Sequence, residues 1–193
     1  MGSFSLGAGA RGHSKSDPEP EIRPCGWPSS VLVASAGLSV VDARIDGMAL
    51  CDYFSAADDH AAAAMARTPG GPGQVALEVV SLKGIDPVVS IAQLEAIATS
   101  CSYEEARPRP RSGQLLSEPD GDSPLVFGLT DTLVQALATA TQDDLWRLAE
   151  PWSMTAEQGR VDCETAAGVL EALADLAQRA RADGMRLYCR WSL

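Results

Sequence analysis

With 193 residues, the chain is long enough for one domain with a sizeable buried core, and its formal net charge of -11 argues against two classes of partner. Nucleic-acid backbones and anionic membrane surfaces both attract clustered lysine and arginine, so we expect neither as a partner. No apolar run approaches the ~20 residues of a membrane-spanning helix. The composition therefore favours a soluble protein whose partner, if it has one, is basic.

The N-terminal stretch, residues 1–28, is rich in glycine, serine and proline and poor in apolar side chains. Burial of so little apolar surface does not offset the entropy of ordering, so we predict a flexible tail over residues 1–28 and one globular domain over residues 29–193. The tail lacks the basic and then apolar segments of a secretory signal. Together with five scattered cysteines, an odd number without C-x-x-C spacing, this predicts a cytoplasmic protein with reduced thiols.

Short apolar runs in the first half of the domain predict strands. The best signal is a hairpin, in which an Asp-Gly pair forms a type I′ turn between residues 40–45 and residues 48–54. Residues 31–36 form a further short apolar run. Residues 75–82 are apolar on both faces, which is typical of a central strand in a sheet.

Capping patterns and the helical spacing of apolar residues predict five helices. The first is alanine-rich, carries the capping-box pair Ser55 and Asp58, and ends near Arg67. The longest begins at Asp162 and ends before Gly184, with arginines in its last turn, where a cation interacts favourably with the helix dipole. The predicted caps, in chain order, are Ser55, Ser90, Thr130 or Asp131, Thr141 and Asp162.

Residues 186–192 alternate between apolar and polar side chains, which predicts a final strand. Its apolar face carries Leu187, Cys189 and Trp191, and we expect Trp191 to be buried. Arg190 lies on the opposite face, where we expect its replacement to be nearly neutral. Because the strand is too apolar for an open edge, we expect it inside the sheet or beside residues 75–82. The predicted fold class is α+β: a small, mostly antiparallel sheet with helices packed on one face.

Residues 102–123 have no periodicity and several prolines, so we predict a long loop within the domain, which is uncommon unless it is functional or disordered. Arg107, Arg109 and Arg111 alternate with prolines there. In an extended conformation they would lie on one side and could hold a carboxylate or phosphate of a partner. The alternative is a solvated loop without a function. These three arginines are the predicted partner-binding residues.

Acidic residues are dense in this loop and after it. They could form a docking face for a basic partner, or they could be an ordinary solvated surface. The residues concerned are Glu104, Glu105, Glu118, Asp120, Asp122, Asp143, Asp144, Glu150 and Glu157.

The residues that could support catalysis form no known signature. His60 is the one imidazole outside the predicted tail, and its neighbours Asp58 and Asp59 point in different directions on a helix, so the three do not converge on a metal ion. Cys51 could be a nucleophile near His60, but a cysteine in an apolar strand more often belongs to the core. We therefore predict no metal site and no cofactor, and we leave open whether the protein is an enzyme.

The segments 146–153 and 187–193, WRLAEPWS and LYCRWSL, resemble those of small actinobacterial proteins. This resemblance covers about the last third of the chain and implies no activity. Abundant arginine and alanine beside only two lysines also indicate a bacterial source. We predict a non-catalytic acidic bacterial protein that acts through protein–protein interaction, of the immunity or accessory type. The alternative is a small-molecule-binding protein or an enzyme with a pocket between the helices and the sheet; the oligomeric state stays open.

Overall fold

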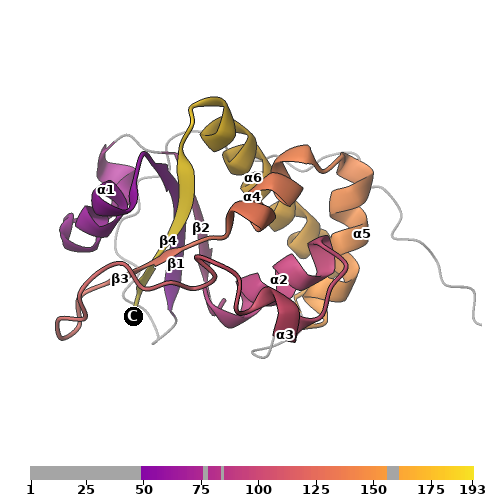
Figure 1. The fold of residues 1–193 in the computed structure, drawn as a ribbon, viewed down its shortest axis with the longest axis horizontal. Coiled ribbons are helices and arrows are strands. Elements are labelled where there is room, and N and C mark those ends of the chain that lie inside the picture. Colours follow the sequence, from indigo (N-terminus) through magenta and orange to yellow (C-terminus); the bar gives the residue numbers. More distant parts are fainter. Residues whose placement is uncertain (1–48, 76–77, 84, 156–160) are drawn as a thin grey trace, which may run out of the picture. The chain divides into compact units, whose positions relative to one another are not determined.

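The computed structural model describes residues 49–75, 78–83, 85–155 and 161–193. Within this part of the chain the structure has a four-stranded antiparallel sheet and six α-helices, which confirms the predicted α+β class (Figure 1). Two predicted strands, residues 31–36 and 40–45, lie outside the described residues, as does the predicted tail over residues 1–28.

The strand order in the sheet is β2-β1-β4-β3, with every neighbouring pair antiparallel. The strands are β1 (Leu50–Ala56), β2 (Val79–Lys83), β3 (Leu125–Gly128) and β4 (Arg186–Ser192). β4 has the predicted bounds and lies inside the sheet, which was one of its two predicted positions. It pairs with β1 along its whole length, from Ser192 opposite Leu50 to Arg186 opposite Ala56.

Both edges of β1 are occupied by described strands, and the first half of the predicted hairpin, residues 40–45, lies outside the described residues. Residues 50–54 pair with β2 on one side and with β4 on the other. The Asp-Gly pattern is a local signal, and it carries no information about strands that arrive from later in the chain.

β2 is shorter than predicted, and it lies at an edge of the described sheet instead of its centre. Pro72–Val75 forms a 3-10 turn, so the strand begins only at Val79. The strand is nevertheless apolar on both faces because both faces are covered. Val80 and Leu82 pack under the large helices, whereas Val79 contacts a smaller apolar cluster on the other side.

One side of the sheet carries most of the helices (Figure 1). α4 (Asp131–Thr139) and α6 (Cys163–Ala182) contact the strands, and α2 (Val89–Ala98) and α5 (Gln142–Ser153) pack against those two helices. Their apolar faces and the sheet enclose the main core. None of the helices in the described part combines the length and the apolar character that a bilayer crossing requires. Side chains without measurable exposure in this core include Cys51, Tyr53, Leu94, Leu133, Leu170, Leu173, Leu187 and Cys189.

A smaller layer covers the other face of the sheet. It consists of α1 (Asp59–Ala64) and the 3-10 turn Met65–Arg67, which lie across the sheet from the other helices in Figure 1. Ala62 and Ala66 of this layer pack on Phe54 and Tyr188 of the central strands. The sheet is therefore a middle layer, with a thick helical layer on one side and a thin alanine-rich one on the other.

The start of α1 differs from the prediction. β1 continues to Ala56, so Ser55 is a strand residue opposite Leu187 rather than a helix cap. Asp58 is the cap, and its carboxylate accepts a hydrogen bond of 2.8 Å from the backbone N–H of Ala61. The pairing of the strand with β4 thus overrides a local capping pattern that is weak by comparison.

Residues 102–123, predicted as a loop, contain the short helix α3 (Tyr103–Ala106) followed by turns. Their second half runs along the outer edge of β3. The Leu116 N–H donates to the Val126 carbonyl at 2.8 Å, and the Gly128 N–H donates to the Gln114 carbonyl at 2.9 Å. The segment therefore satisfies backbone groups that an edge strand would otherwise expose.

Candidate functional site

The three predicted partner-binding arginines do not lie on one extended segment. Arg107 has helical backbone angles at the end of α3, with φ -54° and ψ -44°. Arg111 adopts a positive φ of 71°, which is rare for a residue other than glycine. The predicted extended arrangement is therefore wrong. A capping box at Ser102 starts a helical turn, and backbone hydrogen bonds close further turns at Arg109 and Arg111.

Arg109 points inward to a buried acid. Its Nη1 donates to Glu95 Oε1 at 2.8 Å and to Thr99 Oγ1 at 3.1 Å, and its Nη2 donates to Cys101 Sγ at 3.3 Å. The Glu95 side chain is only 1% exposed. The hydrogen bond to Glu95 raises the pKa of Arg109. Sequence reasoning missed Glu95, although its place inside the apolar stripe of α2 is a signal that such a partner is needed.

Arg111 belongs to a second polar group, which we call the Asp59 cluster: Asp59, Arg111, Arg186 and Tyr188. Asp59 Oδ1 accepts hydrogen bonds from Arg111 Nη1 at 2.7 Å and from the Tyr188 hydroxyl at 2.9 Å, and it lies 3.9 Å from Arg186 Nη1. The Arg111 guanidinium also lies over the Tyr188 ring, 5.3 Å from its centroid. The cluster joins α1, the segment before β3 and β4.

A further ion pair, Asp52 with Arg190, joins β1 and β4 on the same face of the sheet, two residues along β4 from Tyr188. Arg190 Nη1 is 3.6 Å from Asp52 Oδ2, and the two side chains are 11% and 10% exposed. Ser81 Oγ donates to Asp52 at 2.6 Å, and Arg190 Nε donates to the Met65 carbonyl at 3.2 Å. Arg190 is thus covered by the thin layer, and the prediction that its replacement is nearly neutral no longer holds.

Gly71 makes the close approach over Arg190 possible. Its φ is +73°, and a Cβ at this position would come within 2.9 Å of Arg190 Nη1. A larger residue would therefore be strained in its backbone and would collide with the guanidinium.

The candidate catalytic residues do not meet. Cys51 is fully buried in the main core, where its thiol donates to the Ile85 carbonyl at 3.1 Å. His60 is exposed on α1, across the sheet from that core. Asp58 caps the helix and Asp59 serves its own cluster, so the adjacent residues do not converge, as the sequence predicted. Across the described residues, no group of three or more histidine, cysteine or acidic side chains is placed to hold a metal ion.

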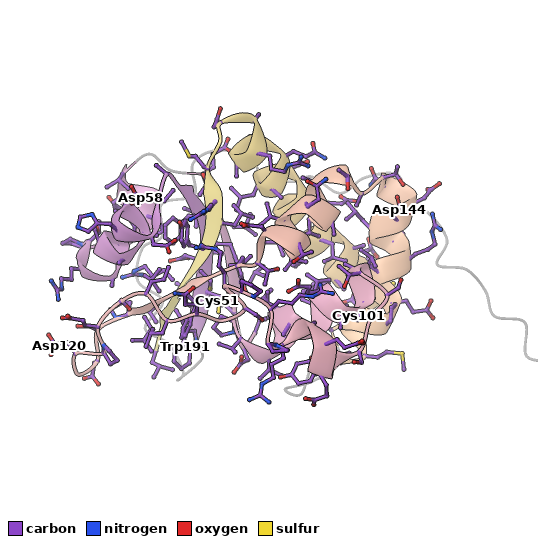
Figure 2. The ribbon with its side chains drawn as sticks, in the orientation of Figure 1. Cys51, Asp58, Cys101, Asp120, Asp144 and Trp191 are labelled. Atoms are coloured by element: carbon purple, nitrogen blue, oxygen red, sulfur yellow. The ribbon has the colours of Figure 1, made fainter. Side chains whose placement is uncertain are left out.

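Three of the predicted acidic residues gather at the end of a loop, which we call the acidic tip: Glu118, Asp120 and Asp122. All three are exposed. The Ser123 N–H donates to the Asp120 carbonyl at 2.9 Å, which closes a turn at the tip, and Ser117 Oγ accepts from the Val126 N–H at 2.9 Å, which fixes its base. Figure 2 shows Asp120 at the end of this loop, away from the sheet.

The other predicted acids do not extend this surface. Asp143, Asp144 and Glu150 lie on α5, and Asp144 lies at the opposite end of the view from Asp120 in Figure 2. Glu157 lies outside the described residues. The acids that the sequence grouped by density therefore form at least two separate surfaces.

Asp59 makes the stability of the fold depend on pH. The hydrogen bond from Arg111 holds the pKa of the Asp59 carboxyl below its ordinary value of 3.8. The charged carboxylate therefore stabilises the fold above this pH, and its contribution is lost as the pH falls below it. We expect Asp59→Asn to lower the free energy of unfolding at pH 7 by up to about 1 kcal/mol, because the carboxylate is partly solvated.

Urea denaturation of both proteins at pH 7 and at pH 3 measures this effect. The difference between wild type and Asp59→Asn should narrow at pH 3. An equal difference at both pH values would show that the carboxylate does not act through its charge.

Comparison with family models, with curated proteins and with solved structures finds no match to this chain.

Proposed function

We propose that the protein acts by binding another protein rather than by catalysis, in the manner of a bacterial cytoplasmic immunity or accessory protein, and that its partner presents a basic surface to the acidic tip. The observation that carries the proposal is the construction of the tip. Its acids are exposed while its base is hydrogen-bonded to β3. A charged loop held in place loses little conformational entropy when a partner binds.

The distribution of arginines supports the same proposal. Arg109, Arg111 and Arg190 are directed at the internal carboxylates of α2, α1 and β1. Because each of these ion pairs is neutral, the formal net charge of -11 falls on the other charged residues of the chain. Such an excess of negative charge speeds the encounter with a basic partner by long-range attraction.

Of the three predicted partner-binding arginines, Arg107 is the one that we retain for contact with a partner. It is exposed at the end of α3, and no ion pair holds it among the described residues. Arg109 and Arg111 are engaged within the chain, and a partner would have to displace Glu95 or Asp59 to reach them.

The alternative, a ligand pocket between the helices and the sheet, receives less support. The side chains that meet there are mainly leucine, alanine and cysteine without measurable exposure. A small-molecule site usually adds a few convergent polar groups to an apolar lining.

The test compares two variants of equal charge. The tip variant carries Glu118→Gln, Asp120→Asn and Asp122→Asn. The control carries Glu104→Gln, Glu150→Gln and Asp175→Asn, which neutralise exposed acids on three helices. Each protein and the wild type are immobilised and used to capture proteins from a lysate of the source organism at low and high salt.

We expect the wild type and the control to retain one basic protein in stoichiometric amount at low salt, and the tip variant to lose it. Purified partner should then bind the tip variant about tenfold more weakly or worse, since three charge contacts are removed. Equal capture by all three proteins would refute the assignment of the tip. Shifts in melting temperature with metabolites but no captured protein would favour the alternative.

A further inference from the structure

The Asp59 cluster offers more hydrogen-bond donors than its one carboxylate uses. Arg111 Nη1 and Nε have acceptors, in Asp59 and in the Leu129 carbonyl. Arg111 Nη2 is buried, and within the described residues it has no hydrogen-bond partner. The side chain as a whole is only 10% exposed. A buried charged donor without an acceptor is costly, so its presence calls for an explanation.

The backbone around this donor is unusual at two positions. Arg111 has the positive φ of 71°, an unfavourable conformation for a side-chain-bearing residue. Opposite it lies Gly128, where a Cβ would come within 3.3 Å of Arg111 Nη2. A strained arginine and a neighbouring glycine together hold the guanidinium over the Tyr188 ring with one edge unused.

The carboxylate now in the cluster comes from a weakly held element. α1 has six residues, and Ala62 of this helix and Ala66 of the turn that follows it make the buried contacts with the sheet. Alanine side chains bury little apolar area, so their contribution to holding the helix in place is small. Asp59 itself is 41% exposed, and its second oxygen, Oδ2, takes part in none of the contacts of the cluster.

We propose that Arg111, Arg186 and Tyr188 form a binding site for the carboxylate of a ligand, and that Asp59 fills this site as an internal substitute. A ligand carboxylate would take the position of Asp59 between Arg111 Nη1 and the Tyr188 hydroxyl. Freed from the geometry of α1, its second oxygen would reach Arg111 Nη2, which gives the two parallel hydrogen bonds that arginine forms best with carboxylates. Displacement of Asp59 would release α1 from the sheet.

This proposal is independent of the acidic tip, because it concerns different residues and a ligand of opposite charge. The ligand is a carboxylate rather than a phosphate, since the group that the site accommodates now is a carboxylate and the guanidinium is already stacked on a ring that limits its movement. The two Nη atoms of Arg111 and the Tyr188 hydroxyl are donors enough for the two oxygens of a carboxylate.

The experiment removes the internal substitute and supplies an external one. Asp59→Ala is titrated with sodium acetate at pH 7, at constant ionic strength set with sodium chloride, and its melting temperature is followed. We expect acetate to raise the melting temperature of Asp59→Ala, and to raise that of the wild type less, because Asp59 competes. In Asp59→Ala with Arg111→Met, the apparent affinity should fall about tenfold or more, since the principal charged donor is gone.

Three results would overturn the proposal: no effect of acetate on Asp59→Ala, an equal effect on both variants, or an effect of inorganic phosphate without one of acetate. If Asp59→Ala is too unstable to measure, Asp59→Ser replaces it, since the short serine side chain leaves the position of the carboxylate open and serine is favoured near the start of a helix. In the wild type, acetate should also increase hydrogen exchange at the amides of α1, because displacement of Asp59 would release this helix from the sheet. Chloride at the same ionic strength should not have this effect.

Discussion

Replacement of Arg190 by methionine is expected to lower the free energy of unfolding by about 3–5 kcal/mol, because it leaves the Asp52 carboxylate buried without a cation. The two side chains are about nine-tenths covered, and the remaining partner of Asp52 within the described residues is the Ser81 hydroxyl. The loss also removes the hydrogen bond to the Met65 carbonyl, which ties the thin layer to the sheet. Urea denaturation at pH 7 measures the change.

The control is the double variant, Arg190→Met with Asp52→Asn. Removal of the charge that Arg190→Met leaves unpaired should restore part of the lost stability, so the double variant should be more stable than Arg190→Met alone. A loss below about 0.5 kcal/mol for Arg190→Met, which is usual for an exposed residue, would show that the thin layer does not cover this face.

Replacement of Leu187 by alanine is expected to cost about 3 kcal/mol, within the usual range for a leucine in a rigid core. Leu187 has no exposed surface and lies on β4, the strand that joins the two halves of the sheet, beneath the main helical layer. The cavity left behind is bounded by the sheet and by helices that themselves pack on one another, so it cannot collapse easily. Thermal or urea denaturation measures the change.

Leu193→Ala provides the matched control. The same substitution six residues later affects a side chain that is 89% exposed, so it should change the stability by less than about 0.5 kcal/mol. Equal losses from the two variants would mean that the alternation of β4 does not place Leu187 in the core.

The elements that could be predicted from the sequence are those with a strong local pattern. The alternation in residues 186–192 defined β4, and the caps Thr130, Thr141 and Asp162 defined the starts of three helices. In each case a few neighbouring residues supply both the period and the stop signal, so tertiary contacts confirm the local preference instead of opposing it.

The extent of cover over each strand could not be predicted in this way. Alternation separated Trp191 from Arg190 correctly by face, but Trp191 is only partly buried near the end of β4, and Arg190 is largely covered. The cover over Arg190 comes from an alanine- and glycine-rich segment that looks like a surface helix and a linker. The alternation of a strand predicts which residues share a face of the sheet, but it does not predict which elements pack on that face.

Only part of the candidate site could be predicted from the sequence, for the same reason. Arg109 and Arg111 stood out in the sequence because of the prolines between them, but their partners come from α2 and α1, 14 and 52 residues away. Such partners are fixed by the packing of whole elements. The exception is Glu95, which interrupts an apolar stripe and so indicates by itself that a buried cation lies near.

The place of β4 in the sheet also constrains the order of events while the chain is being made. β1 and β3 are not neighbours, and β4, the strand that joins them, is translated after both. Until residues 186–192 have left the ribosome, one edge of β1 and the inner edge of β3 expose their backbone hydrogen-bonding groups. Closure of so long a loop late in synthesis is slow, and an unpaired apolar strand can associate with other chains in the interval. The nascent chain is therefore expected to need protection from aggregation until β4 has emerged.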